Sequence, residues 1–309
     1  MIALSGLLFF YCLPAGRQVR QSENIGIVKE RNYAQIMFAG DLMFDRGIRY
    51  SAKKNGGNDF IFSAKGGNLS GLLAEQDLVV ANLEGPITSE KSISTSSNPE
   101  SPQNYFFTFD PSVAKTLYEK NIRLVSLGNN HILNFGKKGL AETQNYLDTA
   151  GVNYFGVPGG ARSIVKEING IKIAFVNYNE FIQDARTDAV EALSEIKKLR
   201  KESDIVVVFC HWGAEYVGPD LAMKNLAHNF IDSGADLVIG AHSHISWPVE
   251  IYKEKRIYYS LGNFIFDQYF QDNVRRGLGV VVKIDKQTKQ MDFLELNFYL
   301  ESTGQTSLR

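Results

Sequence analysis

Short apolar runs alternate with longer amphipathic segments from about residue 35 onward. The short runs predict strands, and apolar residues recurring every three or four positions predict helices. Strands are expected at 35–39, 78–81, 123–127, 171–176, 204–210, 237–239 and 256–260, and helices at 111–120, 138–150, 189–202 and 220–233. Several of these helices end near asparagine or glycine, at Asn121, Gly151 and Gly234. Such alternation predicts a layered α/β sandwich with a largely parallel centre.

Two segments depart from this alternation. Residues 279–300 predict a β-hairpin that turns at Asp285-Lys286-Gln287-Thr288. Residues 88–104 (TSEKSISTSSNPESPQN) are rich in serine and have no periodicity, which predicts a long exposed loop. Long loops in compact domains are often functional lids or disordered, and the sequence leaves both interpretations open.

The N-terminus carries an apolar stretch at residues 2–13 that is too short to span a bilayer comfortably. Its length and the small residues Ala15 and Gly16 suit a signal-peptide core, although no lysine or arginine precedes it. We therefore expect a signal peptide or membrane-tethering leader at 1–24 and a functional domain at 35–300. A secreted or membrane-associated protein would follow. Alternatively, this stretch is a divergent first strand, or the start of the sequence is mis-assigned. The protein would then be cytoplasmic.

Composition narrows the classes of function. The 309 residues are 44% apolar, which is enough for a large core. The net charge of −1, without long blocks of like charge, argues against a nucleic-acid partner. The two cysteines, Cys12 and Cys210, exclude a disulfide framework or a cysteine-rich zinc site, and Cys210 ends an apolar run where a buried cysteine is expected.

Side chains able to bind a metal directly follow five of the apolar strand runs. They are Asp41, Asn82, Glu84, Asn129, Asn130, His131, His211, His242 and His244. Ligands bind beyond the carboxyl ends of strands in α/β sheets, so these groups should converge at one edge. A single histidine at a strand end is usually a hydrogen-bonded structural residue, but four of the five histidines in this register predict a site. The fifth, His228, lies in an expected helix and should be packed or half-exposed.

Seven segments resemble, in order, the capsule-synthesis (CapA, poly-γ-glutamate) family and, more distantly, the calcineurin-like metallophosphoesterases. They are FAGDLMFDRGI (38–48), ANLEGPIT (81–88), FTFDP (107–111), SLGNNHILNFG (126–136), HWGAEY (211–216), IDSGADLVIGAHSH (231–244) and YSLGNFIFD (259–267). Each is weak alone, but seven in order are specific. The resemblance implies an α/β/β/α sandwich of the calcineurin-like metallo-dependent phosphatase type.

The resemblance also implies a bridged site for one or two divalent ions, Mn, Fe or Zn. Matching positions assign Asp41 and His244 to the first ion, Asn130, His211 and His242 to the second, and Glu84 as the bridge. Asn82 could fill part of the bridging role. Imidazole, carboxylate and amide donors together suit these metals.

This sequence departs from the phosphoesterase and family patterns in four places. Met43 stands where the phosphoesterases have a histidine ligand, and a thioether is a poor ligand for a hard hydrolytic metal. An Asn-x-Glu arrangement replaces the bridging aspartate. Asn134 stands where the family usually has aspartate, and Ala241 and Ser243 where its turn usually has histidine and proline. One strong site plus one labile site is therefore as compatible with the sequence as two full sites.

Several residues are candidates for roles around the ions. His131 resembles the histidine that protonates a leaving group or steadies developing charge. Glu215 would orient His211 or be a solvated loop carboxylate, and Arg46 would clamp an anion or be a surface arginine. Asn263 and Asp267 would close the rim of the site, and Gly262 would permit a tight turn there. Trp212 would be a core residue or a platform for substrate.

Three functions follow as hypotheses. The first is an extracytoplasmic metallohydrolase of capsule or poly-γ-glutamate metabolism, in which metal-activated water attacks a phosphoester or an amide bond of a polyanionic polymer or other substrate. The second is a non-catalytic partner of a membrane-bound polymer synthesis or export complex, with a vestigial or structural metal site. The third is a cytoplasmic phosphoesterase with a small-molecule substrate.

Overall fold

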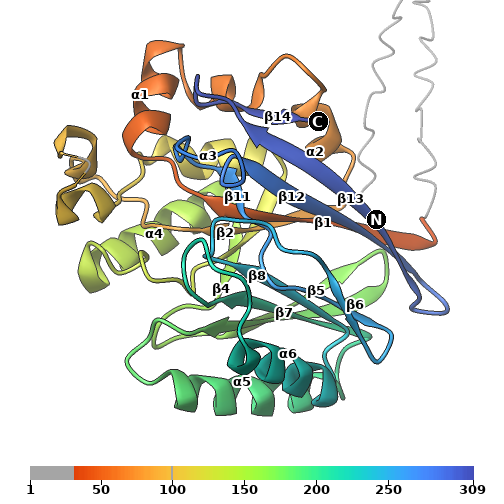
Figure 1. Ribbon diagram of the computed structural model, residues 1–309. Coiled ribbons are helices and arrows are strands. Elements are labelled where there is room, and N and C mark those ends of the chain that lie inside the picture. The colour runs from red at the N-terminus through yellow and green to blue at the C-terminus, as the bar shows by residue number, and fades with distance from the viewer. Residues whose placement is uncertain (1–30, 99) are drawn as a thin grey trace, which may run out of the picture. The chain divides into compact units, whose positions relative to one another are not determined.

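The computed structural model describes residues 31–98 and 100–309. The expected leader at 1–24 lies outside the described residues. Residues 31–309 form two β-sheets packed face to face, with helices on both outer faces (Figure 1). The expected α/β/β/α sandwich is therefore confirmed.

The first sheet has eight strands, with the spatial order β14-β13-β12-β1-β2-β3-β4 and β11 paired to β1. Its strands are β1 (Tyr33–Leu42), β2 (Leu78–Leu83), β3 (Ile122–Ser126), β4 (Asn153–Phe155), β11 (Asn263–Ile265), β12 (Arg276–Asp285), β13 (Met291–Leu300) and β14 (Thr306–Leu308). From β1 to β4 neighbouring strands are parallel, whereas β12, β13 and β14 add an antiparallel edge. The predicted hairpin is β12–β13, and the Asp285 carboxylate accepts the backbone N–H groups of Gln287 and Thr288 at its turn.

The second sheet has six strands in the order β5-β6-β7-β8-β10-β9. They are β5 (Ser163–Ile168), β6 (Ile171–Asn179), β7 (Ile205–His211), β8 (Leu237–Ala241), β9 (Glu250–Tyr252) and β10 (Lys255–Tyr258). The central strands β6, β7, β8 and β10 are parallel, and both edges end in an antiparallel strand. Both sheets therefore present the carboxyl ends of several parallel strands, where ligands usually bind.

Helices cover the two outer faces. The α-helices are α1 (Arg46–Lys54), α2 (Leu69–Ala74), α3 (Ser112–Glu119), α4 (Gly136–Ala150), α5 (Ala185–Leu199) and α6 (Leu221–Asp232), and the short 3₁₀ helices are η1 (Asn58–Phe62), η2 (Ser94–Ser96) and η3 (Pro102–Tyr105). In Figure 1, α5 and α6 lie below the second sheet, and α1 to α4 lie on the side of the first sheet. The predicted ends at Asn121, Gly151 and Gly234 all have positive φ, as helix termini often require.

Alternate residues of the central strands enter different apolar layers. In β1, Ile36 and Phe38 pack between the sheets, whereas Met37 packs on the α1–α4 side. In β7, Phe209 points between the sheets and Cys210 toward α5 and α6. This two-sided burial is why the central strands appear as continuous apolar runs in the sequence.

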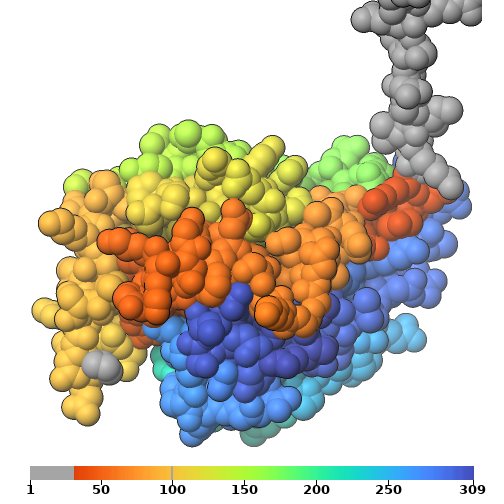
Figure 2. Space-filling view, turned by 90° about the horizontal axis from the view of Figure 1, so that it is seen from above, coloured from red at the N-terminus to blue at the C-terminus, as the bar shows by residue number. Residues whose placement is uncertain are grey.

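The serine-rich segment 88–104 is more ordered than a bare exposed loop. It contains η2 and η3, Thr88 and Ser94 are buried, and the Ser94 and Thr95 hydroxyls donate to the carboxylate of Asp45. The segment lies beside α1 at one end of the molecule, in orange to gold in Figure 2. The sequence analysis could not predict these hydrogen bonds, because local serine content carries no information on contacts with distant residues. Within residues 31–309, leaving aside residue 99, no helix has the length and apolarity needed to cross a membrane.

Candidate metal centre

The predicted ligand residues converge where the two sheets meet. Asp41 lies near the end of β1 and Glu84 directly after β2, so both come from the first sheet. His211 ends β7, and His242 directly follows β8, so these come from the second sheet. All four side chains are buried. Segments that are far apart in the sequence thus contribute to one site.

Five of the six predicted ligands form two overlapping groups. Glu84, His211 and His242 make one group, and Asp41, Glu84 and His244 make the other; in each, one candidate donor atom per residue lies within 4.8 Å of the others. The sixth predicted ligand, Asn130, places its Oδ1 2.9 Å from the Nε2 of His211. The structure therefore brings all six together, and Glu84 is shared, as expected of a bridge.

Glu84 is the electrostatic anomaly of the site. Its side chain is fully buried, and neither carboxylate oxygen has a hydrogen-bond partner among the described residues. Burial and the neighbouring Asp41 charge raise the pKa of Glu84 well above its usual range. Burying a carboxylate without partners is costly, and a positive ion bound next to Glu84 would offset that cost.

Asp41 is held ionised beside it. Burial alone would raise the pKa of Asp41, but contacts with His244, Asn82 and the His242 backbone N–H lower it. The Nδ2 of Asn82 donates to Oδ1 at 2.8 Å and the His242 N–H to Oδ2 at 3.1 Å. The carboxylate is thereby fixed in orientation with its charge retained.

His211 and His242 are neutral at pH 7. Burial first, and then the neighbouring imidazoles, lower the pKa of His211 well below its usual range, and burial lowers the pKa of His242 to about 4. His242 Nδ1 and His211 Nε2 lie only 3.1 Å apart. Neutral imidazoles offer lone pairs, which is the form in which histidine binds metals.

Asn82 serves as a hydrogen-bond hub. Its Nδ2 contacts Asp41 and lies 3.3 Å from His211 Nδ1, and its Oδ1 accepts from Asn129 Nδ2 at 3.1 Å. Both ends of the amide are therefore engaged with neighbours. Through these contacts Asn82 orients Asp41 and His211.

His131 lies beside the cluster, with Nε2 3.9 Å from Glu84 Oε1. Its Nδ1 faces the Oδ1 of Asn134 at 3.2 Å, and the same oxygen accepts the Phe107 backbone N–H at 2.9 Å. Because that oxygen can only accept, Nδ1 carries the proton, and in the neutral ring the Nε2 lone pair faces the cluster. Burial lowers the pKa of His131 to about 4.

The predicted rim residues are in contact with the cluster or with each other. Asn263 Oδ1 lies 2.9 Å from His244 Nδ1, and Asn263 Nδ2 donates to Gln268 at 3.0 Å. Asp267 pairs with Arg46 and accepts the Gly47 N–H at 2.9 Å. Arg46 is thus neither a surface arginine nor a free anion clamp.

Of the two interpretations of Glu215, the structure agrees with the solvated loop carboxylate and not with a partner that orients His211. Glu215 is exposed, and the ring nitrogens of His211 face Asn82, Asn130 and His242 instead. The four-residue spacing suggested contact, but after β7 the chain turns away from the imidazole.

Met43 does not take the place of the missing histidine ligand. It is buried in the layer on the helix side of the first sheet, and its sulfur accepts the Asp45 N–H at 3.0 Å.

Trp212 is core, with its Nε1 donating to the Tyr259 carbonyl, and Cys210 is buried as expected. His228 is half-buried on α6, 2.5 Å from a carboxylate oxygen of Glu250.

The turn that carries the last two histidines has a strained backbone. His242 has φ 91° and His244 has φ 57°, in the left-handed region that side chains rarely occupy. Each such residue costs about 1–3 kcal/mol, and such strain is concentrated at functional sites.

The sequence analysis did not single out three side chains that lie near the site. Asn177 near the end of β6 donates to Ser126 Oγ and to the Phe209 carbonyl. The ring of Phe181 lies 4.1 Å from that of His242, and the ring of Tyr216 lies 5.9 Å from that of His244. Asn177 follows the apolar run Ile171–Val176, so the strand-end signal would have found it; the two aromatic contacts carry no local signal.

The fold and this donor set define an α/β-sandwich protein with a buried carboxylate–imidazole cluster that could hold a metal ion. The chain belongs to the family of bacterial capsule synthesis proteins, PGA_cap, whose model matches residues 35–268.

Three relatives agree with the family assignment. The capsule biosynthesis protein CapA of Bacillus anthracis is 26% identical over 92% of this chain and 73% of its own length. The PGA biosynthesis protein CapA of Bacillus subtilis is 29% identical over 75% of this chain, and the match spans 63% of its length. A probable polyglutamine synthesis accessory protein of Mycobacterium tuberculosis is 28% identical over 62% of this chain and 56% of its own.

A solved structure supports the fold alone. The crystal structure of a hypothetical protein from Thermus thermophilus covers 85% of this chain and 99% of its own, with a TM-score of 0.51 at 16% identity.

Proposed function

We propose that this chain is a metal-dependent hydrolase of capsule or poly-γ-glutamate biosynthesis or processing. The observation that carries the proposal is Glu84, a buried carboxylate without hydrogen-bond partners among the described residues, shared by two groups of donors. A cation would relieve its burial cost. Membership of the capsule synthesis family supports the biological setting. Because of this family membership, we also propose that the protein lies outside the cytoplasm, near a membrane-bound polymer synthesis complex.

The donors would have distinct parts in such a site. Asp41, His244 and Glu84 suit one ion, and Glu84, His211, His242 and Asn130 suit a second. A divalent ion held there supplies Lewis-acid activation of water and of the electrophile. His131, with its Nε2 toward Glu84, can accept a proton at that atom and return it to a leaving group.

One observation favours a second candidate function. Met43, at the position where the phosphoesterases have a ligand, is packed in the core, so the first ion would lack one donor. The Mycobacterium tuberculosis relative is described as an accessory protein. A non-catalytic accessory role, with a structural ion, is therefore the alternative.

Hydrolysis by the metal-loaded protein separates the two candidates. We expect release of product from bis-p-nitrophenyl phosphate or from poly-γ-glutamate with Mn, Fe or Zn. His131→Ala should lower the rate at least about 100-fold, as the loss of an acid–base group does, while metal content stays unchanged. His228→Ala, a histidine on α6 outside the site, is the matched control. A bound metal with no hydrolysis of either substrate would favour the accessory role.

A further inference from the structure

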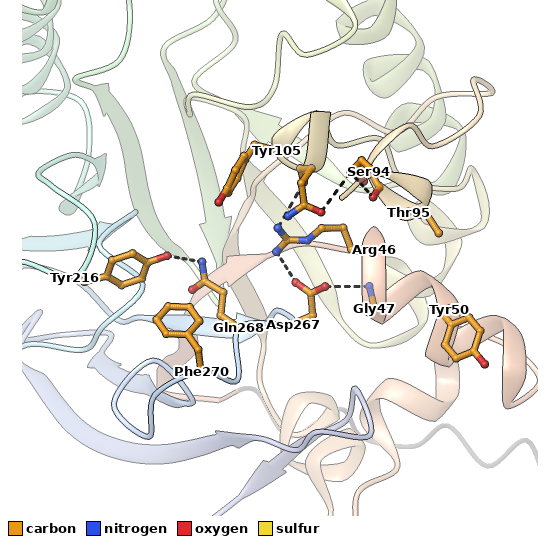
Figure 3. Close-up of a pocket in the computed structure, with 12 residues that line it drawn as sticks. Arg46, Gly47, Tyr50, Ser94, Thr95, Tyr105, Tyr216, Asp267, Gln268 and Phe270 are labelled. Atoms are coloured by element: carbon orange, nitrogen blue, oxygen red, sulfur yellow. Dashed lines mark hydrogen bonds and ion pairs between the residues drawn. The ribbon is translucent and has the colours of Figure 1, made fainter. Parts of the chain in front are cut away.

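A cavity of about 520 Å³ lies between Arg46, Tyr216, Gln268 and Phe270 (Figure 3). Tyr216, which lines it, lies with its ring 5.9 Å from that of His244. Gln268, also in the lining, donates to the Tyr216 hydroxyl at 2.8 Å and accepts from Asn263, which contacts His244. The cavity is thus linked to the cluster by packing and by a short hydrogen-bonded chain.

Exposed aromatic side chains surround this cavity. The exposed fractions of these residues are 63% for Tyr50, 51% for Tyr105, 36% for Tyr216 and 61% for Phe270. In Figure 3, Tyr216 and Phe270 lie on one side of Arg46 and Tyr50 on the other. The Phe270 ring meets Tyr216 edge-on at 5.4 Å. Large apolar rings gathered at the mouth of a polar cavity are typical of a binding surface.

The two charged side chains of the described lining pair with each other, although Arg46 Nε has no hydrogen-bond partner among the described residues. Among the described residues that line the cavity, the charged ones are Arg46 and Asp267, and these form an ion pair with each other. The remaining polar groups are hydroxyls and amides, from Ser94, Thr95, Ser97, Asn104 and Gln268. A run of free carboxylates would meet in this described lining only an arginine that already pairs with Asp267.

A further carboxylate lies close to the cavity. It belongs to Glu215, the exposed residue that directly precedes the lining residue Tyr216 in the chain. Its negative charge would repel an anionic chain. A neutral ligand with hydroxyl and amide groups has no such penalty, and its C–H faces can stack on the exposed rings.

We propose that this cavity binds a neutral sugar ring that carries hydroxyl and acetamido groups, such as a unit of an N-acetylated glycan. The inference rests on the proposed function, because it names the substrate class of the neighbouring site. The aromatic side chains provide stacking faces, and the serine, threonine, asparagine and glutamine side chains provide hydrogen bonds. The substrate of the site would then carry a glycan unit next to the phosphoester or amide bond that the metal cluster would hydrolyse.

Calorimetric titration of the full chain in excess chelator tests this binding without a metal. The probes are a tetramer of N-acetylglucosamine and poly-γ-glutamate of matched length. In chelator, where the cluster holds no ion that could attract a carboxylate, we expect the sugar to bind this cavity at least about tenfold more tightly than poly-γ-glutamate. Phe270→Ala should weaken sugar binding about tenfold, the order expected for one lost stacking contact. Ile251→Ala, an equally exposed apolar side chain on β9, should leave it unchanged.

Three results would overturn the inference. They are no sugar binding at millimolar concentration, sugar binding that Phe270→Ala leaves intact, and poly-γ-glutamate binding that Phe270→Ala abolishes. Because chelator is present throughout, these results are independent of whether the cluster binds metal. Failure of the sugar to bind therefore leaves the proposed hydrolase standing, and failure of metal binding leaves the sugar result standing.

Discussion

At the scale of single residues, we expect Glu84 to contribute much to metal binding and little to the stability of the fold. Its raised pKa means that, without a cation, burial and the Asp41 charge disfavour the charged form of its carboxyl. Glu84→Gln replaces it with a neutral side chain of the same shape, so the free energy of unfolding in chelator should change by less than about 1 kcal/mol. Metal affinity should fall more than about tenfold, because a charged ligand is lost.

Chemical unfolding in chelator, together with metal titration, checks both halves of this prediction. Asn263→Asp offers a comparison that adds a carboxylate near His244 without removing one. A loss of several kcal/mol by Glu84→Gln in chelator would instead assign Glu84 a structural role. Unchanged metal affinity would remove it from the ligand set.

Asp45 fixes the serine-rich segment to α1. Its buried carboxylate accepts from Ser94 Oγ at 2.8 Å, from the Thr108 N–H at 2.9 Å and from Arg49 Nε at 3.0 Å. Burial opposes ionisation, but these hydrogen bonds and the Arg49 charge lower the pKa of Asp45 below its ordinary value of 3.8. A lowered folded-state pKa contributes stability above the unfolded value, and that stability is lost as the pH falls through the folded value.

Asp45→Asn should therefore cost about 2 kcal/mol at pH 7, from weakened charge-assisted hydrogen bonds. The difference from the parent should shrink as the pH falls below 3.8. Denaturant unfolding across pH measures it. Asp292→Asn, an exposed aspartate on β13, should change stability by less than about 0.5 kcal/mol at any pH. A pH-independent deficit for Asp45→Asn would contradict the account.

At the scale of elements, Gly40 allows β1 and β11 to lie close together. A Cβ on Gly40 would lie 1.8 Å from the Gly262 carbonyl oxygen, and the adjacent Asp41 N–H donates to that same oxygen at 3.1 Å. Gly40→Ala must therefore separate the strands and displace Asp41. We expect a loss of more than about 3 kcal/mol, or no folded protein.

Gly56→Ala is the matched control for this close approach. Nothing lies within 4 Å of a Cβ there, and only the positive φ of 88° opposes the change, so about 1 kcal/mol is expected. Thermal unfolding of both variants gives the comparison. Equal small losses would show that β1 and β11 can move apart freely.

The sequence predicted the buried elements better than the edges. The central strands β1, β2, β7 and β8 appear as apolar runs because both of their faces are covered. The edge strand β5 and helix α1 were missed, because half-exposed elements keep much of their polar character. The helix expected at 189–202 begins earlier, at Ala185, where the Asp184 side chain caps it by accepting the Thr187 N–H.

For the site, strand-end position predicted which side chains converge but not how they are oriented. Asp41, Glu84, His211 and His242 follow from the rule that parallel strands end at one edge. The Nδ1–H tautomer of His131 depends on Asn134 and the Phe107 N–H, which is a contact between distant segments. Local patterns carry no information on such contacts.

At the scale of the whole molecule, the donor cluster joins the two sheets. Glu84 comes from the first sheet and His211 and His242 from the second, so a bound ion would cross-link them. A ligand that binds only the folded state adds RT ln(1 + [L]/Kd), about 2.7 kcal/mol at 100 times Kd. Metal should therefore raise the melting temperature of residues 31–309 as one unit.

Metal content and melting temperature of the purified domain, from residue 25 onward, test the central claim most directly. The account predicts stoichiometric Mn, Fe or Zn in the parent and in His228→Ala, and its loss in both His211→Ala and His242→Ala. Melting temperatures should rise on metal addition only in the first two proteins. No bound metal in the parent, and no thermal stabilisation by any of the three ions, would contradict the account.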